Sequence, residues 1–209
     1  MGEPIDVLIV GAGIAGISMA AHLQDMCPDR SFAMIERRER LGGTWDLFRY
    51  PGVRSDSDMQ TLGFVFEPWD NDAAIAPGGA ILDYLDAVAA KRGIAPHIRY
   101  STTVLAADWD SVNGLWQVTM RGPEGEYAQA ARWLYLSTGY YDYDRPYDAQ
   151  IKGLDSFAGP VLHPQSWPAG YDYAGQRVVV IGSGATAVTL VPALATSAAH
   201  VTMLQRTPT

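Results

Sequence analysis

A strand followed by a glycine loop and a helix constrains the fold of this chain more than any other feature. Residues 5–10 form a nearly continuous apolar run, Gly11-Ala12-Gly13-Ile14-Ala15-Gly16 follows, and residues 14–26 continue with helical apolar spacing. A second apolar run at 32–35 completes the pattern. Since parallel strands need a crossover helix, the segment predicts a βαβ unit with a buried parallel sheet.

The spacing G-x-G-x-x-G assigns a different task to each glycine. Gly11 permits the tight turn, Gly13 lets the backbone approach a pyrophosphate, and Gly16 lets the helix pack closely on the strand. The pyrophosphate would lie at the helix N-terminus, where free N–H groups and the helix dipole favour negative charge. Glu36 lies 20 residues after Gly16 at the end of the next strand, where an acid binds the ribose hydroxyls. The sequence therefore predicts a dinucleotide site with an unphosphorylated ribose.

The same device occurs a second time near the end of the chain. The apolar run 177–181 leads into Gly182-Ser183-Gly184-Ala185-Thr186-Ala187, and the next strand, 201–204, ends at Gln205-Arg206-Thr207 without an acid. An arginine at this place accommodates a 2′-phosphate, so the second loop is expected to prefer NADPH. The alternative is that Arg206 is an ordinary surface charge. Two dinucleotide sites in one chain suggest electron transfer, for which NADPH and a flavin are the common pair.

The rest of the chain supports an α/β protein. A long Gly/Pro/Asp-rich stretch, 42–79, shows little periodicity, and segments of this length are usually functional. The remaining expected elements are a helix over 80–92, paired strands at 98–109 and 115–121 around Asn113-Gly114, and a buried strand at 133–136.

Composition excludes several classes of function. The net charge of −8 and the pI near 4.8 argue against a nucleic-acid surface, and Arg37, Arg38 and Arg40 are expected to form a solvated turn. The single cysteine, Cys27, excludes an internal disulfide, a cysteine-rich zinc site and the redox cysteine pair of disulfide reductases. No metal site is expected. The chain lacks a basic leader and any run of ~20 apolar residues, so a cytoplasmic protein without a membrane span is expected.

Two longer motifs carry a resemblance to a known family. Residues Gly42 to Asp56 fit [AG]-G-x-W-x4-[FY]-P-[GM]-x3-D, and residues Phe157 to Pro168, here called the linker motif, fit F-x-G-x3-H-x3-W-[PD]. Both resemble the class B flavoprotein monooxygenases of the Baeyer–Villiger type. The runs Arg49 to Met59 and Gly182 to Ala195 look most similar to the ethionamide-activating members.

The resemblance implies a fold and an activity. The implied fold is an FAD-binding Rossmann-like domain with three layers, a parallel sheet and a β-meander (1–145), then the linker (146–175) and the start of an NADP-binding Rossmann-like domain (176–209). The implied enzyme uses FAD, NADPH and O2 to insert one oxygen next to a ketone carbonyl, with sulfide or thiocarbonyl oxygenation as a side activity.

Family members are more than twice as long, and the family's essential arginine has no counterpart in these residues, so this chain alone is expected to be weak or inactive. Two alternatives stay open: an FAD-binding piece without catalysis, and a simple S/N-oxygenating flavin monooxygenase, against which Trp167 argues. The oligomeric state is also left open.

The resemblance also implies residue roles. Asp56 is implied to lie near the flavin and to position the essential arginine, although an Asx turn beside Ser55 and Ser57 would also explain it. In the linker motif, His163 and Trp167 are implied to anchor the linker, with Phe157 and Gly159 completing the pattern. The FAD-lining set is implied to be Thr44, Trp45, Asp46 and Leu47 at the flavin, and Ala15, Glu36 and Val104 at the adenosine end. The NADP-binding set is implied to be Arg54, Ser55, Asp56, Gly182, Ser183, Gly184, Ala185, Thr186, Ala187, Val188, Arg206 and Thr207.

Overall fold

The computed structural model describes residues 3–206 and divides the chain into two compact units. The first unit comprises the residues up to Asp46, Phe64–Glu67 and Gly79–Tyr140. The second unit comprises Leu47–Gly63, Pro68–Gly78 and the residues from Tyr141 onward. Nothing in the sequence indicated that most of the stretch 47–78 groups with the C-terminal residues. The domain boundaries drawn from the sequence therefore stay a prediction.

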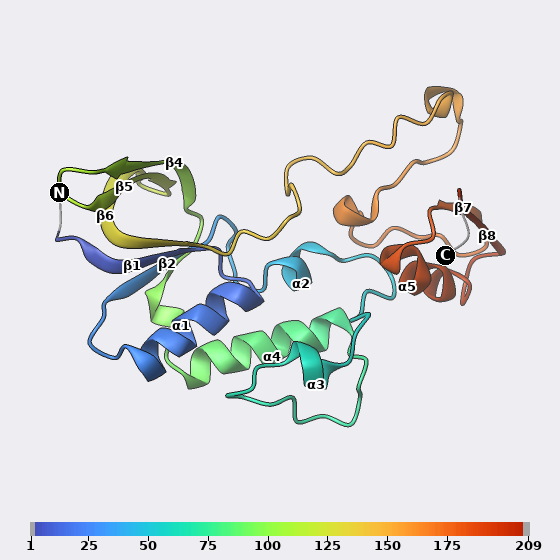
Figure 1. Cartoon of the computed structure of the whole chain (residues 1–209). Helices are drawn as coiled ribbons and strands as arrows, with labels where there is room; N and C mark the ends of the chain where they lie inside the picture. Colours follow the sequence, from blue (N-terminus) through green and yellow to red (C-terminus); the bar gives the residue numbers. More distant parts are fainter. Residues whose placement is uncertain (1–2, 207–209) are drawn as a thin grey trace. The chain divides into compact units, whose positions relative to one another are not determined.

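The first unit is built on one sheet of six strands in the order β3-β2-β1-β6-β5-β4 (Figure 1). Strands β3, β2, β1 and β6 run parallel, whereas β6, β5 and β4 form an antiparallel meander. The predicted α/β class with a parallel sheet and a β-meander is confirmed. The strands are β1 (Ile5–Val10), β2 (Phe32–Ile35), β3 (Ile98–Arg99), β4 (Thr103–Asp110), β5 (Leu115–Gly122) and β6 (Gly125–Leu136).

Strand β6 joins the parallel and antiparallel parts. Its residues Gly125–Ala131 pair with β5, and Ala131–Leu136 pair with β1. The sequence predicted only 133–136 as a strand, because the preceding residues are mostly alanine, glutamate and glutamine, which have low β propensity. The expected strand over 98–109 is likewise two strands, β3 and β4, separated by a left-handed Ser101 with φ 49°.

Three layers bury the apolar residues of the first unit (Figure 1). Helices α1 (Ile14–Met26) and α4 (Gly78–Lys91) cover one face of β1 and β2, where Ile9, Ile17 and Leu85 are fully buried together. The meander covers the other face, where Leu8 and Ile35 pack against Val118, Met120 and Ala131. The 3-10 helix η1 (Ala95–His97) leads into β3. Because β1 and β2 run parallel, their carboxyl ends lie at the same edge of the sheet.

The second unit contains the other glycine loop. Strands β7 (Arg177–Ile181) and β8 (His200–Leu204) pair in parallel, and α5 (Ala185–Leu194) connects them. Leu190 and Leu194 of α5 are buried with Phe48 and Tyr50. The stretch predicted as irregular contains two single-turn helices, α2 (Thr44–Leu47) and α3 (Met59–Leu62), and the linker contains the 3-10 helices η2 (Leu154–Ser156) and η3 (Pro164–Ser166). Among the described residues, every helix is too short or too polar to cross a membrane.

Candidate dinucleotide-binding site

The first glycine loop connects β1 to α1 and is held from two sides. Gly11 has φ +107°, and a Cβ there would lie 2.5 Å from the Ser137 carbonyl oxygen at the end of β6. A Cβ on Gly16 would lie 2.0 Å from the Gly11 carbonyl oxygen. These two glycines are therefore required by the packing of the chain itself. Ser137 strengthens this contact, since its hydroxyl lies 2.8 Å from the Val10 carbonyl and 3.0 Å from the Gly11 carbonyl.

Gly13 differs from the other two glycines of this loop. It is the N-cap of α1 with φ −81° and ψ −171°, a conformation open to any residue, and its nearest neighbour would be the Gly43 Cα, 3.5 Å from an added Cβ. In the part of the chain that the structure describes, no side chain caps α1, and the first turn of the helix holds no acidic residue. Ala15 is exposed in that turn. The helix N-terminus is therefore a suitable place for an anionic pyrophosphate.

Glu36 follows β2 and lies against the first loop. Its side chain is only 5% exposed; Oε2 accepts the Ala12 N–H at 2.9 Å and Oε1 accepts the Arg38 N–H at 2.9 Å. Each carboxylate oxygen has a second lone pair, so the group can also accept ribose hydroxyls. The position, the carboxylate and the free N–H groups of α1 together fit the adenosine diphosphate part of a dinucleotide.

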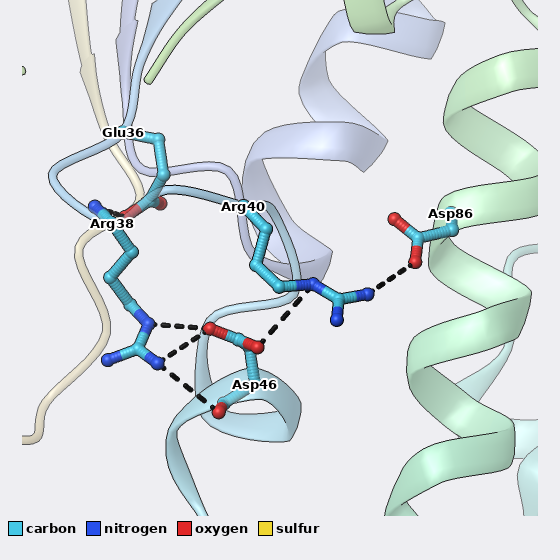
Figure 2. Close-up of polar contacts among 5 residues, drawn as sticks. All are labelled: Glu36, Arg38, Arg40, Asp46 and Asp86. Atoms are coloured by element: carbon cyan, nitrogen blue, oxygen red, sulfur yellow. Dashed lines mark hydrogen bonds and ion pairs between the residues drawn. The ribbon is translucent and has the colours of Figure 1, made fainter. Parts of the chain in front are cut away.

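A charged network fixes the segment after Glu36 (Figure 2). The carboxylate of Asp46, 3% exposed, accepts Nε of Arg38 at 2.7 Å and Nη2 at 2.6 Å through Oδ2, and Arg40 Nε lies 3.5 Å from Oδ1. Arg40 also pairs with Asp86 of α4 at 2.9 Å. Arg37 and Arg40 are exposed, as expected of a solvated turn, whereas Arg38 is partly buried, because Asp46 turns inward toward it.

The other predicted FAD-lining residues lie nearby in the first unit, with one exception. Gly42 donates to the Ala12 carbonyl at 2.9 Å, which places Thr44 and Trp45 directly after the loop contact. Thr102 donates its N–H to the Glu36 carbonyl at 3.0 Å, and Val104 follows two residues later in β4, beside a β-bulge. Leu47 is grouped with the second unit.

The second glycine loop has the same backbone form and more space around it. Gly182 has φ +125°, and Gly184 is the N-cap of α5 with φ −73° and no side-chain cap. Within residues 3–206, a Cβ on Gly184 would meet nothing within 4 Å. Packing among these residues gives no reason for a glycine there, whereas a phosphate group approaching the backbone would. Ala187 is buried, and Val188 is 56% exposed. Ser183, Ala185 and Thr186 complete the loop and the first turn of α5.

The end of β8 lies beside this loop. Gly182 donates its N–H to the Leu204 carbonyl at 2.8 Å, and Arg206 follows two residues later with an exposed side chain. The arginine is therefore at the edge of the sheet where the sequence expected a 2′-phosphate. The predicted Thr207 lies outside the described residues.

Part of the motif Gly42 to Asp56 packs against α5 in the second unit. The Tyr50 hydroxyl lies 3.1 Å from Oγ1 of buried Thr189, and a Cβ on Gly52 would lie 2.5 Å from the Thr189 carbonyl. Thr189 also donates to the Thr186 carbonyl at 3.0 Å. The aromatic and glycine positions of this motif thus have a structural explanation. Thr189 was missed by the sequence reasoning, because a threonine inside an apolar helix gives no separate signal.

The predicted residues at the end of that motif differ in their surroundings. Ser55 is buried, with its hydroxyl accepting the Ala76 N–H at 3.0 Å and its own N–H bonded to the Ala76 carbonyl at 2.9 Å. Arg54 and Asp56 on either side are exposed. Asp56 belongs to the second unit, whereas Glu36 belongs to the first.

The linker motif has an internal structure. A Cβ on Gly159 would lie 2.7 Å from the Phe157 ring, so the glycine leaves room for that ring. Trp167 packs against the buried cluster formed by Phe48, Tyr50, Leu190 and Leu194. The tryptophan therefore ties the linker to this cluster.

His163 and Gln165 hold the turn between these aromatic residues. His163 Nδ1 accepts the Gln165 N–H at 3.1 Å, and burial lowers the pKa of His163 below its ordinary value. Gln165 is 9% exposed and donates Nε2 to the Asp142 carbonyl at 2.6 Å. The sequence reasoning missed Gln165, because it occupies a variable position of the motif.

Comparisons with known proteins agree with this architecture. A family profile described as pyridine nucleotide-disulphide oxidoreductase matches residues 8–209. The FAD-containing monooxygenase EthA of Mycobacterium tuberculosis (strain ATCC 25618 / H37Rv) is 55% identical over 210 residues, covering 100% of this chain and 43% of the relative. The probable FAD-binding monooxygenase AlmA of Acinetobacter baylyi is 49% identical, covering 100% of this chain and 42% of the relative. The chain thus spans about two fifths of the length of the curated relatives it matches.

Solved structures share the fold over nearly the whole chain. The OTEMO complex with FAD and NADP has a TM-score of 0.82 at 33% identity, covering 99% of this chain and 40% of that one. An ε-caprolactone-bound cyclohexanone monooxygenase has a TM-score of 0.84 at 28% identity, covering 98% and 40%. Cys27, exposed, is the one cysteine of the sequence, so the chain cannot form the disulfide in the family's description by itself. From the match over residues 8–209, the chain belongs to the pyridine nucleotide-disulphide oxidoreductase family, and the relatives it resembles are FAD-containing monooxygenases.

Proposed function

We propose that the first glycine loop binds FAD, that the second binds NADPH, and that the two serve a monooxygenase. The observation that carries the proposal is the uncapped N-terminus of α1 beside the buried carboxylate of Glu36. The relatives named as FAD-containing and the solved complex with FAD and NADP support the cofactor choice. The domain boundaries at 145 and 175 belong to the same proposal.

The chain's own residues bind and orient the cofactors. Backbone N–H groups at the start of α1 would hold the FAD pyrophosphate, and Glu36 would accept the ribose hydroxyls. The α5 N-terminus would hold the NADPH pyrophosphate, with Arg206 beside its 2′-phosphate. Bound FAD supplies hydride acceptance and reaction with O2. Asp56 would orient a guanidinium near the flavin, as a charge-assisted pair does.

The proposed overall reaction is insertion of one oxygen atom next to a ketone carbonyl, with sulfide oxygenation as a side activity. The likeness to cyclohexanone monooxygenase and the presence of Trp167 in the linker motif support a ketone as the substrate. A simple S/N-oxygenating flavin monooxygenase would oxygenate a sulfide and leave the ketone unchanged. The two activities are therefore separated by their products.

Binding of NADPH at the second loop is tested with Gly184→Ala. An added Cβ meets no atom of the residues that the structure describes within 4 Å, so the stability should hold, whereas NADP+ affinity should fall by about tenfold or more through lost phosphate hydrogen bonds. FAD affinity serves as the control and should not change. Equal NADP+ affinity in the wild-type and variant chains would contradict the assignment.

Oxygen transfer is tested in a longer background. In a chimera, this chain replaces the 210 matching residues of M. tuberculosis EthA, to which it is 55% identical. With FAD, NADPH, O2 and cyclohexanone, we expect the chimera to form ε-caprolactone, detected by gas chromatography. In a parallel reaction with methyl phenyl sulfide as the substrate, we expect the sulfoxide. A folded, FAD-loaded chimera that forms only the sulfoxide would support the simple flavin monooxygenase instead. One that forms neither product would contradict both readings.

A further inference from the structure

We propose that Asp46 makes the first dinucleotide site selective, by holding Arg38 and Arg40 in internal ion pairs so that neither is available to a 2′-phosphate. The inference rests on the proposed FAD site. It assigns to Asp46 a role in discrimination between dinucleotides, in place of direct contact with the flavin.

Arg38 lies two residues after Glu36, and its backbone N–H is bonded to the Glu36 carboxylate. In dinucleotide-binding folds, an arginine near the acid that follows the second strand is what accommodates a 2′-phosphate. This loop therefore carries both the acid that selects a free ribose and a guanidinium of the kind that would select its phosphate.

The guanidinium of Arg38 is occupied by Asp46. Arg38 donates Nε and Nη2 to the same oxygen of Asp46, at 2.7 and 2.6 Å, and Nη2 also reaches the Asp46 backbone carbonyl at 3.3 Å (Figure 2). The carboxylate is 3% exposed. A buried charge needs a partner, and removal of that partner is strongly unfavourable, so the pair will not open readily to admit a phosphate.

Arg40 is held by two carboxylates. Its Nε faces the second carboxylate oxygen of Asp46 at 3.5 Å, and its Nη2 pairs with Asp86 of α4 at 2.9 Å. Within the five residues of Figure 2, two positive charges face three negative ones. This cluster opposes an additional phosphate near Glu36 and leaves the ribose hydroxyls of FAD unaffected.

The experiment compares two competitors for the first site. FAD is bound to the chain, and its release by ADP or by 2′,5′-ADP is followed through flavin fluorescence. This signal comes only from the FAD, so ligands bound at the second loop do not contribute to it. Wild type should release FAD with ADP at lower concentration than with 2′,5′-ADP. Asp46→Asn removes the carboxylate that faces Arg38, whereas Arg40 keeps its pair with Asp86, and the ratio of the two competing concentrations should shift about tenfold toward 2′,5′-ADP, the value of one charge-assisted hydrogen bond.

Three further variants make the outcome decisive. Asp46→Asn combined with Arg38→Gln should return the ratio to the wild-type value, and Asp86→Asn, which changes only the exposed end of the network, should leave it within about twofold. Arg38→Gln alone leaves Arg40 as the charged partner of Asp46 and should also leave the ratio unchanged, so it tests the inference if Asp46→Asn fails to fold. An unshifted ratio in folded Asp46→Asn, or a loss of 2′,5′-ADP binding in Arg38→Gln alone, would overturn the inference. Absence of FAD binding in wild type would instead refute the proposed function.

Discussion

Two alanine substitutions in the first glycine loop should separate packing from ligand binding. In Gly16→Ala the new Cβ would lie 2.0 Å from the Gly11 carbonyl oxygen, against the 3.0 Å below which Cβ contacts are essentially not observed. The start of α1 must therefore move by about 1 Å relative to the loop, and overpacking of this kind costs ~1–3 kcal/mol or more. Since domains are stable by only ~5–15 kcal/mol, the urea midpoint of this variant should fall clearly.

Gly13→Ala should behave in the opposite way. Its Cβ would lie 3.5 Å from the Gly43 Cα, an ordinary contact, at a φ of −81° that alanine adopts. Alanine is a poorer N-cap than glycine, but it also lowers the entropy of the unfolded chain by ~0.4–1 kcal/mol, so the net change in stability should be near zero. The methyl group would stand between the backbone and a pyrophosphate, and FAD affinity should fall about tenfold or more.

The assay measures both quantities on the same preparations: urea unfolding by circular dichroism and FAD titration by flavin fluorescence. Wild-type FAD affinity in Gly13→Ala would show that the loop does not contact the pyrophosphate. Equal urea midpoints for Gly13→Ala and Gly16→Ala would show that the contact between Gly16 and Gly11 does not crowd the fold.

Three further predictions concern the second unit. Ser55→Ala leaves the buried Ala76 N–H without its side-chain acceptor and should cost ~1–3 kcal/mol of unfolding free energy, measured in urea; an unchanged midpoint would mean that water replaces the hydroxyl. Trp167→Ala should cost ~2–3 kcal/mol, somewhat less than a fully buried tryptophan, and Trp167→Phe should recover a large part; equal losses in both would contradict the packing explanation. Because burial lowers the pKa of His163 from 6.5, the unfolded chain binds more protons, so stability should fall as the pH drops below 6.5. His163→Gln should flatten the change in urea midpoint between about pH 7.5 and about pH 5.5, and an unaltered slope would show that other groups cause it.

The sequence predicted the parts of the fold that depend on short-range pattern. The runs 5–10, 14–26, 32–35 and 177–181 became β1, α1, β2 and β7 with the same bounds, because apolar periodicity and glycine punctuation are local signals. Strand β6 was found only in its last four residues, since its first part depends on pairing with β5 and not on propensity.

In the candidate site, too, the residues that depend on spacing along the chain were predictable from the sequence. Glu36 follows the glycine loop at a fixed distance along the chain, and the structure places it against Ala12. The ion pairs of Arg38 and Arg40 with Asp46 were not predictable, because a run of charged residues usually indicates a solvated face, and only the turn at Gly42 and Gly43 brings the carboxylate back toward them. Gln165 and Thr189 were missed for a related reason: their partners Asp142 and Tyr50 are far away in the sequence.

The measurement that tests the central claim most directly is anaerobic reduction of the flavin. The 209-residue chain is saturated with FAD, and its flavin absorbance is followed after NADPH is added without oxygen. If both glycine loops bind their proposed cofactors and cooperate, the oxidised flavin band should bleach, with much slower bleaching in Gly184→Ala. Bound flavin that stays oxidised in excess NADPH would contradict the pairing of the two sites in this chain.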